Sequence, residues 1–202
     1  LDVRSVAVTY RQSKQLNELA RAMIKVEGGS DQLTSPPEYV DAEGVSPALL
    51  ENTSSFADIA AWLSKRIGEI EQFVEKLPST AIFVNSEDDV VPVANALNLA
   101  IAEHNLRAVP CPQGQVMGQD NDVRVFDIQH IKGLEFEAVF FISIDRLASL
   151  HPETFDKFLY VGVTRAATYL GLTCYERLPP SMEELREKFT LDWEKSSIGT
   201  KN

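Results

Sequence analysis

The chain has 202 residues, of which 44% are hydrophobic and 24% charged, so we expect a globular core and do not expect general disorder. Its net charge of −11 argues against a broad nucleic-acid-binding surface, which needs clustered Lys and Arg, although a narrow basic groove stays open. Two cysteines without CxxC spacing are expected as buried thiols in a reducing compartment. The sequence shows no signal peptide and no apolar run of membrane-spanning length, so we expect a soluble cytoplasmic protein without a membrane partner.

Short apolar segments along the chain predict strands. They occupy residues 5–10, 80–85, 107–111, 123–128, 138–143 and 169–174, with a weaker candidate at 47–52. Strands that are apolar throughout are typical of a sheet covered on both faces. Because helical patterns alternate with them, the sequence predicts an α/β fold with a largely parallel sheet.

Helices are predicted between these strands from apolar spacing and capping residues. Ser55 with Asp58 forms a capping box that starts the clearest helix, and Ser86 with Asp89 looks like a second cap. Further helices are expected over residues 16–23, 155–167 and 181–189. Residues 1–189 are predicted to form one domain, and 190–202 a polar tail that is a candidate for disorder. Since the pattern starts abruptly at Leu1, we expect a fragment of a larger protein.

Three polar segments stand beside predicted strands, where ligands of such sheets collect at the carboxyl ends. They read "YRQS" (10–13), "HIKGLEF" (130–136) and "YVGVTRAA" (160–167). Taken singly, each segment is more often a solvated strand end, a glycine turn or a charge on a helix surface. Their combination and order are much more specific.

The ordered set "YRQS", "KGLEF" and "LYVGVTRA" resembles motifs IV, V and VI of UvrD/Rep-type superfamily 1 DNA helicases. Those motifs lie in the C-terminal, second RecA-like domain of the motor, and the resemblance spans residues 1 to about 175. It implies a RecA-like three-layer sandwich, with a P-loop NTPase-like fold that lacks the P-loop. The short stretch before "KGLEF" resembles compact members of the family, without the large helical insertion.

The resemblance also implies roles for single residues. Tyr10 would stack on the adenine of ATP, and Glu135 would contact the ribose. Arg11 and Arg165 would reach the γ-phosphate as catalytic residues. Gly133 would permit close approach of the backbone. The chemistry agrees, because guanidinium groups bind phosphate oxygens through two parallel hydrogen bonds and stay charged at any working pH.

The sequence contains no GxxxxGK[ST] motif and no Gly-Lys pair. The loop that cradles phosphates is therefore missing from this chain. The implied cofactor is ATP with Mg²⁺, with the metal held by an N-terminal RecA-like domain of the same full-length protein. Asp145, at the end of an apolar run, is interpreted as a strand-end residue facing a loop rather than as a magnesium-binding aspartate.

Single-stranded DNA is the second implied ligand, with candidate contacts at Gln129, His130 and Lys132. Where the family has Thr and His, this chain has Asp127 and Gln129, so His130 is the candidate substitute. An aspartate is unfavourable beside phosphates unless it is paired or faces away. The three histidines lack metal-ligand spacing, so no zinc site is predicted.

The sequence therefore predicts the C-terminal motor domain of an ATP-dependent superfamily 1 helicase or translocase acting on single-stranded DNA. The isolated fragment is expected to be inactive. An alternative is an ATP-driven switch or scaffold domain that regulates a partner protein without unwinding. A third reading is a structural α/β domain whose motifs are coincidental.

Overall fold

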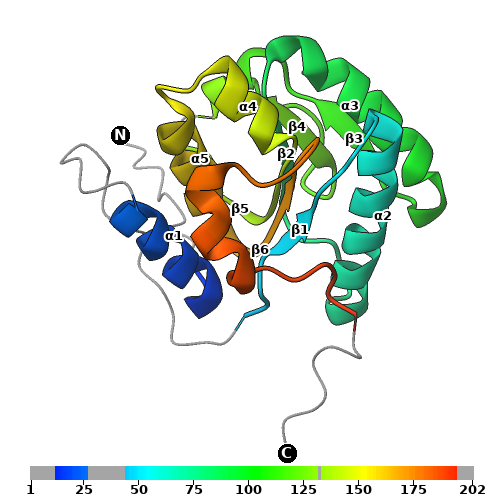
Figure 1. The fold of residues 1–202 in the computed structure, drawn as a ribbon. Coiled ribbons are helices and arrows are strands. Elements are labelled where there is room, and N and C mark those ends of the chain that lie inside the picture. Colours follow the sequence, from blue (N-terminus) through cyan, green and yellow to red (C-terminus); the bar gives the residue numbers. More distant parts are fainter. Residues whose placement is uncertain (1–11, 27–43, 132, 195–202) are drawn as a thin grey trace, which may run out of the picture.

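The computed structural model describes residues 12–26, 44–131 and 133–194 of the chain (Figure 1). The strands are β1 Ala48–Leu50, β2 Thr80–Val84, β3 Ala108–Pro110, β4 Val123–Asp127, β5 Phe136–Phe141 and β6 Ala166–Thr173. The α-helices are α1 Lys14–Val26, α2 Phe56–Phe73, α3 Glu87–Ala100, α4 Ile144–Leu150 and α5 Phe155–Thr164. Short 3-10 helices follow at η1 Ala102–His104, η2 Pro112–Gly114, η3 Ile128–His130 and η4 Pro180–Lys188.

The strands form one six-stranded sheet in the order β1-β6-β5-β2-β4-β3, and every pair within it is parallel. This confirms the predicted α/β class and parallel sheet. The order places β2 in the interior, between β4 and β5, although both of these strands come after it in the chain. Because β4 and β5 both run parallel to β2, the connection from β4 to β5 must run back along the sheet from its carboxyl edge to its amino edge.

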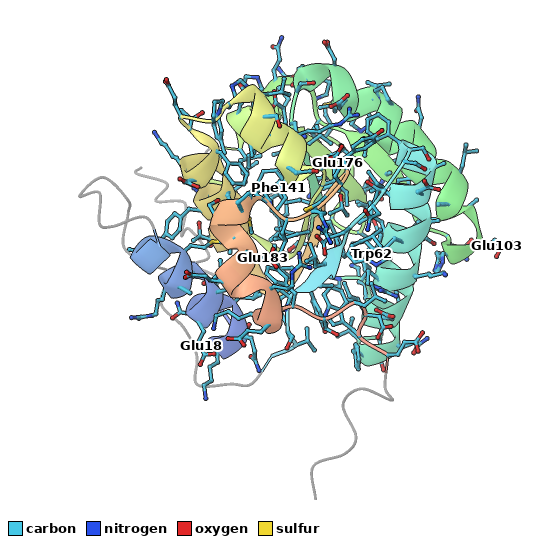
Figure 2. All side chains as sticks on the ribbon, in the orientation of Figure 1. Glu18, Trp62, Glu103, Phe141, Glu176 and Glu183 are labelled. Carbon is cyan, nitrogen blue, oxygen red and sulfur yellow. The ribbon has the colours of Figure 1, made fainter. Side chains whose placement is uncertain are left out.

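Alternate side chains of each strand enter two separate cores. Phe83 and Phe141 face the core that α1 and α5 cover, whereas Ile82 and Phe140 face the core beneath α2 and α3. In Figure 1 these two helix pairs lie on opposite faces of the sheet. Figure 2 shows Trp62 and Phe141 inside the fold and Glu103 at its surface. The three-layer sandwich predicted from the sequence is therefore confirmed.

The two predicted helix caps have different outcomes. The Ser55 side chain accepts a hydrogen bond from the Asp58 backbone N–H at 3.2 Å, as the capping box predicted. At the start of α3, however, the Ser86 side chain makes no capping bond, and its backbone carbonyl accepts from the Asp89 N–H instead. The helix still begins where the sequence indicated.

Other predictions need correction. The helix predicted over 155–167 ends at Thr164, so Arg165 caps the helix and Ala166 already belongs to β6. Asp145 is not a strand-end residue, because β5 ends at Phe141 and Asp145 lies in the first turn of α4. The strand expected at 5–10 lies outside the described residues.

The packed part of the chain continues past the boundary predicted at residue 189. Thr190 forms a parallel bridge with Ala48, and its carbonyl accepts from the Leu49 N–H at 2.8 Å. The Trp193 ring is 3% exposed, and its Nε1–H donates to the Ser46 carbonyl at 2.8 Å. The segment is tied to the sheet because a large aromatic ring gains from burial once its N–H has a partner.

None of the helices among residues 12–26, 44–131 and 133–194 has both the length and the apolar character needed to cross a membrane.

Candidate functional site: two edges of the parallel sheet

The residues singled out from the sequence separate onto two edges of the sheet. Glu135 and Arg165 lie at the amino-terminal edge, because they directly precede β5 and β6, whereas Gly133 lies in the connection between η3 and β5. Gln129 and His130 lie at the opposite edge, just after β4. The expectation that the whole "HIKGLEF" segment sits at the carboxyl end of a strand is thus wrong. The segment leaves that edge after β4 and reaches the start of β5 only at Phe136.

Glu135 and Arg165 are neighbours at the amino-terminal edge. The Phe136 N–H donates to the Arg165 carbonyl at 2.9 Å, and Phe136 stands opposite Ala166 in the register of β5 and β6. Glu135 is therefore the last residue before β5, and Arg165 is the last residue before β6. These two strands are neighbours in the sheet. Both side chains are partly exposed.

The segment before α1 is bound to the same place. The Gln12 amide is 1% exposed and donates to the carbonyls of Val163 at 3.2 Å and Ala166 at 3.1 Å, on either side of Arg165. The Ser13 N–H donates to the Ala167 carbonyl at 2.7 Å. Two further candidates, Tyr10 and Arg11, immediately precede Gln12 in the sequence but lie outside the described residues.

The guanidinium group of Arg165 is incompletely satisfied. Its Nε is buried and has no hydrogen-bond partner among the residues that the structure describes. A buried charged donor without an acceptor is destabilising by several times the net gain of an ordinary hydrogen bond. Such a donor matches an anionic oxygen brought by a ligand, because charge-assisted hydrogen bonds are among the strongest in proteins.

Gly133 has a positive φ of 70°, which side chains disfavour, and an added Cβ would meet nothing within 4 Å in the domain. This glycine is needed for its backbone conformation rather than for packing inside the domain. Gly162, within the "LYVGVTRA" motif, is different, because an added Cβ would collide with the Phe141 ring. That motif glycine lets α5 lie directly on β5.

A hollow of about 780 Å³ opens at the amino-terminal edge and is lined in part by Glu135. Side chains of both charges surround it, including Lys76, Asp120 and Arg124. Arg165 is not among its lining residues. The hollow therefore offers space beside Glu135.

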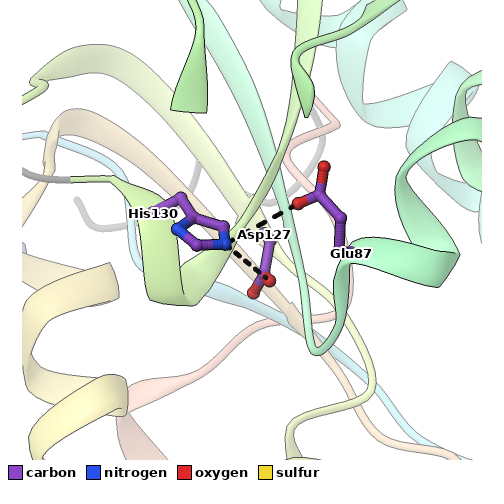
Figure 3. A group of neighbouring side chains, drawn as sticks. All are labelled: Glu87, Asp127 and His130. Carbon is purple, nitrogen blue, oxygen red and sulfur yellow. Dashed lines mark ion pairs between the residues drawn. The ribbon is translucent and has the colours of Figure 1, made fainter. Parts of the chain in front are cut away.

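The carboxyl-terminal edge brings together Glu87, Asp127 and His130, from the start of α3, the end of β4 and the end of η3 (Figure 3). His130 Nε2 lies 3.7 Å from Asp127 Oδ2 and 4.0 Å from Glu87 Oε2. Burial raises the pKa of Asp127, and the Gln129 N–H, which donates to Oδ1 at 3.0 Å, acts in the opposite direction. Asp127 is 3% exposed, and Figure 3 shows it turned toward His130.

The proposed DNA contacts lie beside this acidic pair. Gln129 and His130 are exposed, and the Gln129 amide lies 3.5 Å from the Asn85 carbonyl. Lys132 lies outside the described residues. Sequence reasoning missed Glu87, which stands 40 positions before Asp127 and approaches it only through the pairing of β2 with β4. The acidic run "EDD" at the start of α3 was its only signal.

Comparison with known proteins gives a consistent result. The family model of the UvrD-like helicase C-terminal domain matches residues 122–173, a segment that contains Asp127, Glu135 and Arg165. Among solved structures, the chain is similar to the C-terminal domain of a possible DNA helicase from Lactobacillus plantarum WCFS1. The identity is 17% and the TM-score 0.60, and the match covers 91% of this chain and 98% of that one. At this identity the likeness shows the fold.

A hypothetical ATP-dependent RNA helicase from Sulfolobus tokodaii is also similar, at 12% identity and a TM-score of 0.46. That match covers 88% of this chain and 56% of that one. The search of curated proteins gave no match. The fold defines an α/β domain with an all-parallel sheet, as in the first of these structures. More particularly, the match over 122–173 confirms the predicted resemblance to the UvrD-like helicase C-terminal domain.

Proposed function

We propose that the chain is the C-terminal motor domain of an ATP-dependent superfamily 1 helicase or translocase that acts on single-stranded DNA. The observation that carries the proposal is the buried, unpartnered Nε of Arg165 next to Glu135 at the start of two adjacent strands. A guanidinium held in this state fits the terminal phosphate of a nucleotide bound at the amino-terminal edge. An N-terminal RecA-like domain of the same protein would face this edge.

In this proposal Arg165 is the arginine finger, which stabilises the charge that develops on the transferring phosphoryl group. Glu135 accepts hydrogen bonds from ribose hydroxyls, with the hollow beside it as available space. Tyr10 and Arg11 supply a stacking face and a second phosphate contact, next to the anchored Gln12. Bound ATP with Mg²⁺ supplies the phosphoryl group, and the N-terminal domain holds the metal. Closure of the two domains would bring Arg165 into place.

The test uses the full-length protein and its nucleic-acid-stimulated ATPase rate. Arg165→Ala is expected to lower kcat by roughly 10³-fold or more, as for other arginine fingers. Arg165→Lys keeps the charge but loses the planar group of donors, so it should recover little activity. Arg177→Ala removes an exposed arginine elsewhere and is the matched control. Near-normal turnover by a folded Arg165→Ala protein would refute the finger role.

The second candidate is an ATP-driven switch that regulates a partner protein without unwinding. Glu87 and Asp127 favour this candidate, because they make the carboxyl-terminal edge of the sheet acidic. This is the edge at which the resemblance implies contacts with DNA. Binding of full-length protein to single-stranded DNA separates the two candidates. A motor should bind with at least micromolar affinity at moderate salt and weaken as salt rises. Absence of binding even at low salt would favour the switch.

A further inference from the structure

We propose that Glu87, Asp127 and His130 form a binding site for a divalent transition-metal ion at the carboxyl-terminal edge of the sheet. The three side chains offer two carboxylate oxygens and one imidazole nitrogen, all within 4.8 Å of one another (Figure 3). They come from three separate elements, α3, β4 and η3, so the fold itself creates the cluster. This site is separate from the amino-terminal edge, and the proposal does not depend on nucleotide binding there.

The spacing is unsuited to direct hydrogen bonds. His130 Nε2 lies 3.7 Å from Asp127 Oδ2 and 4.0 Å from Glu87 Oε2, beyond the normal range for an N–H···O bond. Two ligands about 2.1 Å from one zinc ion in tetrahedral geometry stand roughly 3.4 Å apart. The two distances from His130 Nε2 therefore need to shorten by only a few tenths of an ångström, and the two carboxylate oxygens, which lie within 4.8 Å of each other, would also have to approach the ion.

Each carboxylate is already oriented by a backbone group. Glu87 Oε1 accepts from the Gln113 N–H at 2.8 Å, and Asp127 Oδ1 accepts from the Gln129 N–H at 3.0 Å. The second oxygen of each is the one nearest His130 Nε2. Metal sites commonly fix their ligands by such outer hydrogen bonds.

The remaining oxygen of Glu87 points independently to a ligand. Glu87 Oε2 is buried and has no hydrogen-bond partner among the described residues. Asp127 is 3% exposed, whereas the side chain of Glu87 is 36% exposed, so limited access of water applies to Asp127 and to the Oε2 atom of Glu87. Burial, together with repulsion by Glu87, raises the pKa of Asp127, and a cation bound between these carboxylates would relieve their mutual repulsion.

Protonated His130 is the competing cation, and it would make the cluster a simple ion pair. It explains the geometry less well, because an imidazolium N–H would draw at least one carboxylate oxygen to hydrogen-bond distance. The side chain of His130 is 43% exposed, so an ion could enter from solvent. The imidazole ligand favours Zn²⁺ or Co²⁺ over Mg²⁺, Ca²⁺ and Mn²⁺, which prefer oxygen ligands.

The test is titration of the purified 202-residue chain with Co²⁺, followed by visible absorbance and by competition with Zn²⁺. One saturable equivalent is expected. His130→Ala and Asp127→Asn should each weaken binding by at least about 10-fold. Asp127→Asn retains an oxygen that can accept from Gln129, and circular dichroism checks that both variants fold.

The control is His104→Ala, which removes another histidine with a carboxylate neighbour, since His104 Nδ1 lies 3.0 Å from Glu71 Oε1. It should leave Co²⁺ binding unchanged. The proposal is overturned if no saturable binding occurs, or if folded His130→Ala binds Co²⁺ as tightly as the parent chain. Equal loss of binding in His104→Ala would also overturn it, because the site would then lie elsewhere.

Discussion

Gly162 of α5 lies against the ring of Phe141 in β5 so closely that no side chain fits between them. The motif "LYVGVTRA" therefore contains a packing requirement as well as Arg165. The helix must approach the sheet at this point for Arg165 to cap it and for β6 to begin one residue later.

Gly162→Ala is expected to destabilise the domain by about 1–3 kcal/mol, because the added methyl forces Phe141 or the helix to move. Urea unfolding measures the change. Combining it with Phe141→Leu should give less destabilisation than the sum of the two single changes, since the smaller side chain makes room. Gly68→Ala is the control, because its Cβ would approach only the His104 ring edge at 3.3 Å, and alanine favours a helix. A loss in Gly68→Ala as large as that in Gly162→Ala would contradict the argument.

Glu51 links the end of β1 to η4. It accepts from the Leu178 N–H at 2.8 Å and from two nitrogens of Arg186. Hydrogen bonds from Arg186 are the main reason that the pKa of Glu51 lies below its usual value. Because the folded state lowers this pKa, the stabilisation is present above the unfolded pKa of about 4.3 and is lost as pH falls through the folded pKa.

Glu51→Gln should accordingly lower the free energy of unfolding at pH 7 by about 1 kcal/mol, a modest value because Arg186 is partly exposed. The difference from the parent chain should shrink below about pH 4. Denaturant unfolding at several pH values measures both effects. Glu183→Gln, at the more exposed partner of Arg186, should have the smaller effect. A difference that persists unchanged into acid would rule out this account.

Asp145 holds α4 against the end of β6. Its two carboxylate oxygens accept from the Tyr175 N–H at 2.7 Å and the Glu176 N–H at 2.8 Å. Asp145→Ala should therefore lower stability by about 1 kcal/mol. In the folded full-length protein, Asp145→Ala should leave the ATPase rate near normal. Replacing a magnesium-binding aspartate would instead lower that rate. A kcat loss comparable to that of Arg165→Ala would contradict the structural role.

The 202-residue chain alone is expected to hydrolyse no ATP, because it lacks the GxxxxGK[ST] loop that cradles phosphates. Phosphate release from the purified chain measures this. Arg165→Ala in the same chain is the control, since contaminating activity would be unaffected by it. Sustained turnover that disappears with Arg165→Ala would show that the chain has a complete site of its own.

Much of the sheet could be predicted because its central strands are apolar on both faces, so short apolar runs marked β2, β4 and β5 directly. The placement of "KGLEF" could not be predicted from the run alone. It depends on β4 and β5 both running parallel to β2, because the chain must then return to the amino-terminal edge before β5 begins.

The candidate site was predicted only in part for a related reason. Glu135 and Arg165 carry specific motifs, whereas Glu87 has no local pattern that connects it with Asp127 and His130. The end of α5 was misplaced because Arg165 and the alanines after it favour a helix by themselves. Pairing with β5 overrides that preference from Ala166 onward.

The bridge between Thr190 and Ala48 has a consequence for self-association. An open strand edge is a template for pairing with another molecule. In this domain the segment after η4 pairs with the outer edge of β1 through Thr190. At the other end of the sheet, β3 is only three residues long and finishes with Pro110, which has no N–H to offer. A chain shortened to residue 189 would uncover the β1 side and should oligomerise or precipitate more readily than the longer one.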